Sequence, residues 1–379
     1  MTWIRDNILK IAVLLVIFVV AIVLVSVFSG KNKGPKEERA TGYIELENKL
    51  QSAAINYAKD NNSILPNNRD EVTKVKLETL IKKRYIGNLK AVDNHSVKCN
   101  GYVTIERLST DDEDYKFYPH ISCGKYYTTS TLAEKIKGKE KIVTENDGLY
   151  KVNDKLVFKG EYPRNYIKLD NSLYRILSID SDNTLKLIST KRTGNRYVWD
   201  DRYNAELKQN YGINNFMKSR LKDSLEFLYY NTSTEIDAVE QSYSDKEKKY
   251  FTYHDFCIGK RSNQDDSMTS TDTCSEVYNT RIGLIELNEY YQASTDPNCK
   301  KAGQYDCNNY NYLYAFSNNT FVTINAHKDD TNTYFLIYQG QAMLEKAYKA
   351  NYLYPVVYIS SENTYVSGTG TSSDPYIIR

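Results

Sequence analysis

The chain has few of the residues that usually build metal centres. Among its 379 residues there are only four histidines, and no two of the six cysteines are spaced as Cys-x-x-Cys. Structural zinc sites take cysteine and histidine ligands at such short spacings. We therefore expect no metal and no cofactor.

An excess of charge of one sign is also lacking. The 50 basic residues are almost balanced by 48 acidic ones, which leaves a formal net charge of +2. Nucleic-acid-binding domains usually carry a strongly basic surface. The composition therefore indicates no nucleic-acid partner.

Long hydrophobic runs are absent after the first 30 residues. Residues 11–28 form the one uncharged apolar stretch, and a helix rising about 1.5 Å per residue over this length nearly spans a hydrocarbon core of about 30 Å. It predicts a transmembrane anchor between a cytoplasmic N-terminus (1–10) and a juxtamembrane tether (29–40). A cleaved signal peptide is the alternative, but the run does not end in a small-residue cleavage site.

The cysteines supply the orientation, because positive charges flank the apolar run on both sides. Six cysteines in spaced pairs on an anchored chain favour disulfides and an oxidising exterior. Many pairings are open to six cysteines, and we expect nearest neighbours to pair: Cys99 with Cys123, Cys257 with Cys274, and Cys299 with Cys307. The expected location is the cell membrane, with a single span and extracellular C-terminal domains.

Residues 41–128 show a helical pattern followed by strands. Apolar side chains recur at helical spacing over 43–57, a shorter helix is expected near 77–81, and strands are expected at 101–107 and 115–123. This plan, with the turn from Thr79-Leu80-Ile81 to Tyr85-Ile86-Gly87, resembles pilins and type II secretion pseudopilins. The resemblance implies a pilin-like helix-plus-sheet module, although the Gly and Glu of a prepilin processing site are absent.

The rest of the chain changes to a period of two. Residues 129–147 are rich in Lys and Glu and are interpreted as a linker or a solvated helix. Within 148–379 the clearest hairpins are centred on Asn153-Asp154, on Asp170-Asn171 and on residues 180–183. Later strands are expected at 312–316, 320–324, 333–338 and 353–359, and the long polar segment 231–280 has no predicted role.

An ordered set of short motifs in 148–379 carries a second resemblance. They include residues 158–180 (FKGEYPRNYIKLDNSLYRILSID), 282–291 (IGLIELNEYY) and 352–359 (YLYPVVYI). The set resembles uncharacterised bacterial surface domains, and its layout is similar to C-type-lectin-like folds. The fold class expected for the whole chain is α+β, with an N-terminal transmembrane helix, a small pilin-like module and a larger mixed α+β domain.

Three groups of residues invite a functional interpretation. His254, Asp255 and Cys257 suggest a thiol nucleophile, but a disulfide of Cys257 is the preferred interpretation. The carboxylates at 265, 266 and 272 suggest Ca²⁺, but they lack the spacing of an EF-hand loop. The third group is a candidate binding surface for a protein or glycan, formed by Trp199, Asp200, Asp201 and Arg202.

Tyrosine is unusually frequent, with 35 residues. Tyrosine favours strands and interfaces, although a compositional bias of the genome explains the number equally well. With no catalytic constellation, we expect a membrane-anchored extracellular protein that presents a non-catalytic binding or adhesion domain, not an enzyme. The alternatives are a pseudopilin-like component of a secretion or uptake apparatus and, third, a cell-envelope hydrolase or transferase using His254 and Cys257. The oligomeric state does not follow from the sequence.

Overall fold

Strands dominate the computed structural model of the chain. The structure describes residues 35–69, 71–108, 114–230, 243–262, 274–299, 310–316 and 320–379. Strands account for 36% of the structure and helices for 22%, in several separate sheets. The expected α+β class is therefore wrong, because strands outweigh helices and the described helices after α2 (Pro35–Asp60) are only one to three turns long.

No helix within the described ranges is long and apolar enough to cross a membrane. The predicted span at 11–28 and the N-terminus at 1–10 lie outside the described residues. The last residues of the expected tether, 35–40, belong to the first described helix, α2 (Pro35–Asp60).

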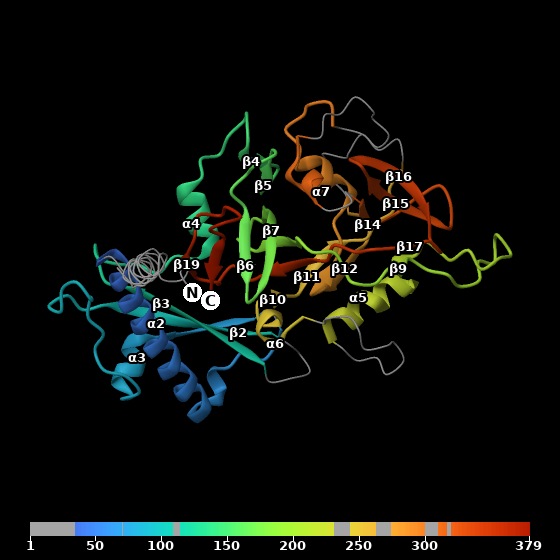
Figure 1. Cartoon of the computed structure of the whole chain (residues 1–379). Helices are drawn as coiled ribbons and strands as arrows, with labels where there is room; N and C mark the ends of the chain where they lie inside the picture. The colour runs from blue at the N-terminus through green and yellow to red at the C-terminus, as the bar shows by residue number, and fades with distance from the viewer. Residues whose placement is uncertain are drawn as a thin grey trace, which may run out of the picture.

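The smaller of two hydrophobic cores lies between α2 and a three-stranded antiparallel sheet (Figure 1, blue to cyan). The helical pattern predicted over 43–57 is confirmed, because Leu50 and Ala54 are fully buried against the sheet. Besides α2, this unit contains η1 (Asn62–Ile64), β1 (Val72–Lys76), α3 (Leu77–Lys82), β2 (Asn100–Arg107) and β3 (Tyr115–Ser122).

A disulfide closes the predicted β2–β3 hairpin. Asn100 pairs with Ser122 in the antiparallel register, and the adjacent Cys99 and Cys123 are bonded to each other. Such a bond restricts the unfolded chain and typically stabilises a fold by about 2–4 kcal/mol. This pairing is confirmed.

The segment 129–147, expected to be a linker or a solvated helix, contributes to the larger core instead. Its helix α4 (Leu132–Lys139) begins with a capping box, in which Thr131 accepts from the backbone of Glu134 and the Glu134 carboxylate accepts from Thr131 N–H. Leu132 and Ile136 are fully buried. The few apolar residues lie on one side of a short helix in which polar and charged residues predominate. The sequence therefore did not reveal that this side is buried.

A ten-stranded sheet organises the larger unit, in the order β10-β18-β8-β7-β6-β20-β19, with β13 paired to β18 and the β4–β5 hairpin paired to β7. All its neighbours are antiparallel except β20 and β6. Its strands are β4 (Gly148–Val152), β5 (Lys155–Lys159), β6 (Tyr166–Leu169), β7 (Ser172–Ile179), β8 (Leu185–Ser189), β10 (Phe251–Thr252), β13 (Ile282–Gly283), β18 (Val356–Ile359), β19 (Tyr365–Ser367) and β20 (Tyr376–Ile378).

The predicted hairpins of this sheet are confirmed. Asn153, Asp170 and Asn183 have positive φ angles of 54°, 49° and 70° at the three predicted turns, a conformation that Asn and Asp tolerate better than most residues. The chemistry of the turn residues was therefore enough to predict the turns.

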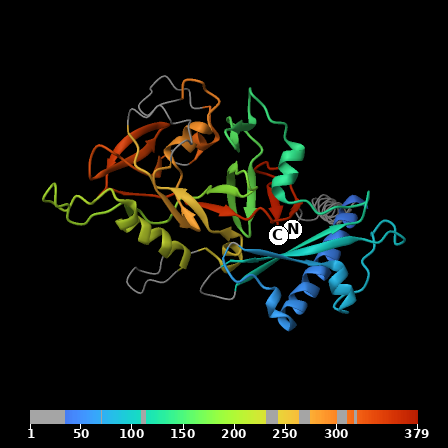
Figure 2. The ribbon, with the colours of Figure 1, turned by 180° about the vertical axis from the view of Figure 1, so that it is seen from behind.

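Smaller sheets and short helices cover the large sheet (Figures 1 and 2). The predicted strand at 312–316 is wrong: Asn311 caps a 3-10 helix there by accepting from Leu313 N–H. The remaining strands are β9 (Tyr197–Val198), β11 (His254–Cys257), β12 (Val277–Thr280), β14 (Thr320–Ala326), β15 (Thr333–Tyr338), β16 (Gln341–Lys346) and β17 (Ala350–Asn351). The helices are η2 (Phe216–Lys218), α5 (Arg220–Tyr230), α6 (Asp245–Lys248), α7 (Leu287–Gln292) and η4 (Tyr312–Ala315).

Candidate functional site

Two of the four residues of the predicted binding surface are buried. Trp199 is 1% exposed, and its ring stacks on Tyr334 with centroids 4.8 Å apart. The buried Asp200 accepts from Arg202 Nε at 2.7 Å and from Ile213 N–H at 2.9 Å. Asp201 and Arg202 are exposed, and Asp201 pairs with Arg220 at 2.6 Å. Trp199 and Asp200 therefore support the surface and do not face solvent.

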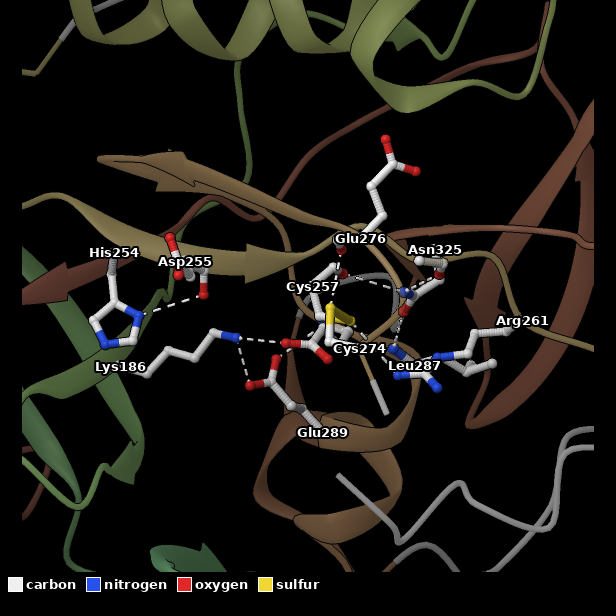
Figure 3. Close-up of a disulfide and its surroundings, with 12 residues drawn as sticks. Lys186, His254, Asp255, Cys257, Arg261, Cys274, Glu276, Leu287, Glu289 and Asn325 are labelled. Atoms are coloured by element: carbon white, nitrogen blue, oxygen red, sulfur yellow. Dashed lines mark hydrogen bonds and ion pairs between the residues drawn. A yellow bond between two sulfur atoms is a disulfide. The ribbon is translucent and has the colours of Figure 1, made fainter. Parts of the chain in front are cut away.

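The predicted thiol nucleophile is not available, because Cys257 is bonded to Cys274 (Figure 3). The ring of His254 stacks on Tyr358, with centroids 3.8 Å apart, and its Nε2 lies 3.7 Å from Asp180. No cysteine within the described ranges is free. The disulfide predicted here is confirmed, and it joins the end of β11 to the chain just before β12.

The other residues singled out in the sequence are only partly described. Cys299 is disulfide-bonded, but Cys307 lies outside the described residues, so the predicted Cys299–Cys307 pair stays a prediction. The carboxylates at 265, 266 and 272 lie outside them as well. Within the described ranges, no group of three or more His, Cys, Asp or Glu side chains is placed to hold a metal ion.

Beside the Cys257–Cys274 disulfide lies a buried ionic cluster that the sequence did not reveal (Figure 3). Lys186, with no exposed surface, lies 3.1 Å from a Glu286 oxygen and 2.5 Å from a Glu289 oxygen. Both carboxylates also form the capping box of α7. Because Lys186 finds its carboxylate partners within the fold, we assign this cluster to the stability of the fold.

A cleft of about 990 Å³, with room for a ligand, lies at the end of the β4–β5 hairpin. One wall comes from the hairpin and the turns before and after it, and the other from the end of α7 and the chain that follows it. The lining combines tyrosines, carboxylates and neutral polar groups: Thr144, Glu145, Asn146, Asp147, Tyr150, Lys159, Glu161, Tyr291, Ser294, Thr295, Asp296, Pro297, Cys299 and Tyr310.

Backbone hydrogen bonds fix the two walls to each other. Gly160 N–H donates to Ala293 O at 2.9 Å, Tyr312 N–H donates to Gly160 O at 2.7 Å, and Thr295 N–H donates to Tyr310 O at 3.0 Å. The three segments therefore form one rigid frame, so the cleft exists before a ligand enters.

Asp147 fastens the rim of the cleft. Its carboxylate accepts from the backbone N–H groups of Glu161 at 3.1 Å and Tyr162 at 2.7 Å. Gly160 has a φ of +104°, and a Cβ there would lie 2.0 Å from the Asp147 Oδ1 atom. A glycine is needed at this position because the carboxylate occupies the place of a side chain.

Aromatic rings and one cation give the cleft its chemistry. Tyr310 is 51% exposed, whereas Tyr291 is buried and its hydroxyl accepts from Ala342 N–H at 2.9 Å. Lys159 lies over the ring of Tyr150, with Nζ 5.1 Å from the centroid, and burial lowers the pKa of this lysine. The cleft offers ring faces together with donors and acceptors of hydrogen bonds.

Comparisons with models of protein families, with curated proteins and with solved structures found no match to this chain. The cleft itself is therefore the basis for assigning a function. Sequence reasoning missed it, because its walls come from segments more than a hundred residues apart. The high tyrosine content was the one feature of the sequence that hinted at a binding site, but it does not show which tyrosines line a common cleft.

Proposed function

We propose that the protein is exported and binds a glycan in the cleft between the β4–β5 hairpin and the chain after α7. The observation that carries the proposal is a rigid, open cleft that presents tyrosine rings next to carboxylate, amide and hydroxyl groups. Ligand sites are typically preformed concavities with apolar surfaces and a few polar groups. A sugar ring has one face of C–H groups suited to an aromatic ring and a rim of hydroxyls that need hydrogen-bond partners.

The proposed location outside the cytoplasm is supported by the two disulfides, Cys99–Cys123 and Cys257–Cys274. Disulfides persist in oxidising compartments and are rare in the reducing cytosol. Acid quenching of intact cells followed by thiol alkylation tests this location. An exported protein carries no label on these four cysteines until it is reduced, whereas labelling without reduction contradicts export.

The ligand class is tested by titrating the purified protein with neutral linear oligosaccharides built from glucose, xylose or N-acetylglucosamine, using calorimetry. We expect at least one of them to bind, and we expect Tyr310→Ala to weaken binding about fivefold, because an aromatic contact contributes about 1 kcal/mol. Tyr310 is suitable because half of its surface is exposed, so its removal leaves the fold intact.

Tyr338→Ala is the matched control. Tyr338 is 45% exposed at the end of β15 and does not line the cleft. Equal effects of the two substitutions, or a folded wild-type protein that binds none of the oligosaccharides, would argue against a glycan in this cleft. Binding of a polypeptide in the cleft, and of no oligosaccharide, would assign the cleft to a protein ligand.

A further inference from the structure

A second surface lies where two segments that are distant in the sequence run side by side. Strand β9 pairs with β17, with Val198 opposite Ala350 and Tyr197 opposite Asn351. The contact continues in both directions, because Thr193 N–H donates to Leu353 O at 2.8 Å and Asp200 N–H donates to Ala347 O at 3.0 Å. Residues 193–200 and 347–353 therefore form one extended ribbon.

The loop after β9 is fixed at its base and projects beyond β9 and β17 in both views (Figures 1 and 2). Asn204, 2% exposed, donates from Nδ2 to Gly212 O at 2.8 Å, and Gly212 N–H donates to Arg202 O at 2.9 Å. Asp200 accepts from Ile213 N–H. The loop thus holds its exposed side chains in place instead of collapsing on the core.

Positive charge is concentrated along this ribbon and loop. The segments 191–212 and 345–353 contain seven basic and four acidic residues, in a chain whose formal net charge is only +2. Two of these acids are already engaged, because Asp200 pairs with Arg202 and Asp201 pairs with Arg220. The surface therefore has cations in excess of the carboxylates that face them.

The cations lie next to tyrosine rings. The guanidinium groups of Arg192 and Arg196 lie 3.8 Å and 5.0 Å from the centroid of Tyr352. Lys349 Nζ lies 5.3 Å from the ring centroid of Tyr348. The Tyr348 ring also stacks on the Tyr211 ring, with centroids 5.2 Å apart. In the part of the chain that the structure describes, Arg192, Arg196 and Lys349 have no carboxylate partner within 4.0 Å.

We infer that this arginine–tyrosine surface binds an anionic polysaccharide. We define it as Lys191, Arg192, Arg196, Tyr211, Tyr348, Lys349 and Tyr352. A ribbon of cations interleaved with flat rings matches a linear polymer that repeats a carboxylate or sulfate on every few sugar rings. The surface is independent of the cleft at the β4–β5 hairpin, because no residue lines both.

A membrane is the less suitable occupant of the same charges. Insertion into lipid needs apolar groups free to enter the acyl region. Leu207, 42% exposed, is the one large aliphatic side chain that the loop exposes, and the ring of Tyr203 is exposed as well. The rings of Tyr211, Tyr348 and Tyr352 contact guanidinium groups or each other. The balance of groups therefore favours a hydrated polymer.

The experiment measures binding of the full chain to immobilised heparin and polygalacturonate, with neutral dextran as the uncharged polymer. We expect binding to both anionic polymers and not to dextran, and we expect it to weaken when NaCl is raised from about 50 mM to about 500 mM, because salt screens exposed charges. Arg192→Ala/Arg196→Ala is expected to weaken binding about tenfold or more. Arg192→Lys/Arg196→Lys keeps the charge but not the forked guanidinium that stacks on Tyr352, and it is expected to lose less affinity than the double alanine variant.

The matched control is Lys82→Ala/Lys83→Ala, which removes the same charge from the exposed end of α3. It is expected to bind as the wild type does, and thermal unfolding checks that all variants are folded. Unchanged binding by the double arginine variant, an equal loss in the lysine control, or failure of both anionic polymers to bind would each overturn the inference. Binding to vesicles of anionic phosphatidylglycerol but not to the polysaccharides would overturn it in favour of a membrane.

Discussion

Lys186 is a fully buried cation held between two carboxylates. Burial by itself would lower its pKa, but Glu289, Tyr358 and Glu286 together raise the pKa well above its ordinary value, so the ammonium stays charged. Its Nζ also lies 5.2 Å from the ring centroids of Phe256 and Tyr358. Buried charges of this kind tolerate the loss of a partner poorly, because the remaining charge has no water to solvate it.

Glu289→Gln is expected to lower the free energy of unfolding by about 3 kcal/mol, the smaller end of the range for a broken buried pair because Glu286 remains beside Lys186. Guanidinium denaturation measures the change. Asp201→Asn is the control, since its pair with Arg220 is about half exposed and such a pair contributes about 1 kcal/mol or less. Similar losses in both variants would show that the buried cluster stabilises the fold no more than a half-exposed ion pair does.

At the scale of elements, local chemistry predicted some features well and others not at all. The hairpin turns at Asn153, Asp170 and Asn183 depend on the residue at the turn itself, and all three are confirmed. The predicted strand at 312–316 became η4, because Asn311 caps it and its backbone joins Gly160 across the cleft. Strands β1 and β16 were missed, since each takes its pairing from a neighbour and carries a weak pattern of its own.

Gly212 is the glycine on which the projecting loop depends. Its φ is +71°, and a Cβ there would lie 1.8 Å from Asp200 O. Gly212→Ala is therefore expected to cost about 1–3 kcal/mol of stability from backbone strain alone, with a lower midpoint of thermal unfolding.

Gly138, in the last turn of α4, supplies the contrast. A Cβ there meets nothing within 4 Å, and alanine restricts the unfolded chain without strain in the folded one. Gly138→Ala is expected to raise stability by about 0.4–1 kcal/mol. An unchanged or higher midpoint for Gly212→Ala would refute the requirement for glycine at 212, and a lower midpoint for Gly138→Ala would contradict the gain expected there.

At the scale of the whole molecule, the smaller sheet has α2 on one face and the larger unit on the other (Figure 1). The contacts on this second face are polar. His120 Nε2 lies 3.2 Å from a Glu362 oxygen, Lys116 donates to Asn363 at 2.7 Å, and Arg281 donates to the Leu108 carbonyl. The two hydrophobic cores are thus joined by hydrogen bonds and charges instead of by shared apolar packing.

Lys116 makes this junction sensitive to pH. Its Nζ lies 4.3 Å from the ring centroid of Tyr250, and burial lowers its pKa from 10.5 to about 7, although Glu106 acts in the opposite direction and Lys249 in the same one. Between these two pH values the unfolded chain holds a proton that the folded chain has released. The free energy of unfolding should therefore rise with pH across this window.

Denaturation of the wild type and of Lys116→Met at several pH values between about 7 and 9 measures this effect. The stability of the wild type relative to the variant is expected to increase with pH, because only the wild type carries the titrating group. Lys82→Met, an exposed lysine of α3, is expected to keep the wild-type dependence. Parallel pH profiles for the wild type and Lys116→Met would contradict a lowered pKa of Lys116 at the junction.

The sequence by itself determined the features that depend on neighbouring residues: the helical face over 43–57, the hairpin turns, and the pairing of Cys99 with Cys123 and of Cys257 with Cys274. In each case the interaction lies within one local segment, so spacing and turn chemistry suffice to predict it.

Only the tertiary structure decided the balance of sheet over helix, the burial of Trp199, and the two surfaces proposed for binding. Each of these depends on segments far apart in the chain. In the cleft, Thr295 and Tyr310 are hydrogen-bonded and line the same space as Tyr150. In the second surface, Arg192 lies over the ring of Tyr352. Periodicity reports which side of an element is apolar, but it does not report what that side meets. In this chain, the packing of distant segments buries Trp199 and leaves Arg192 and Tyr310 at the surface.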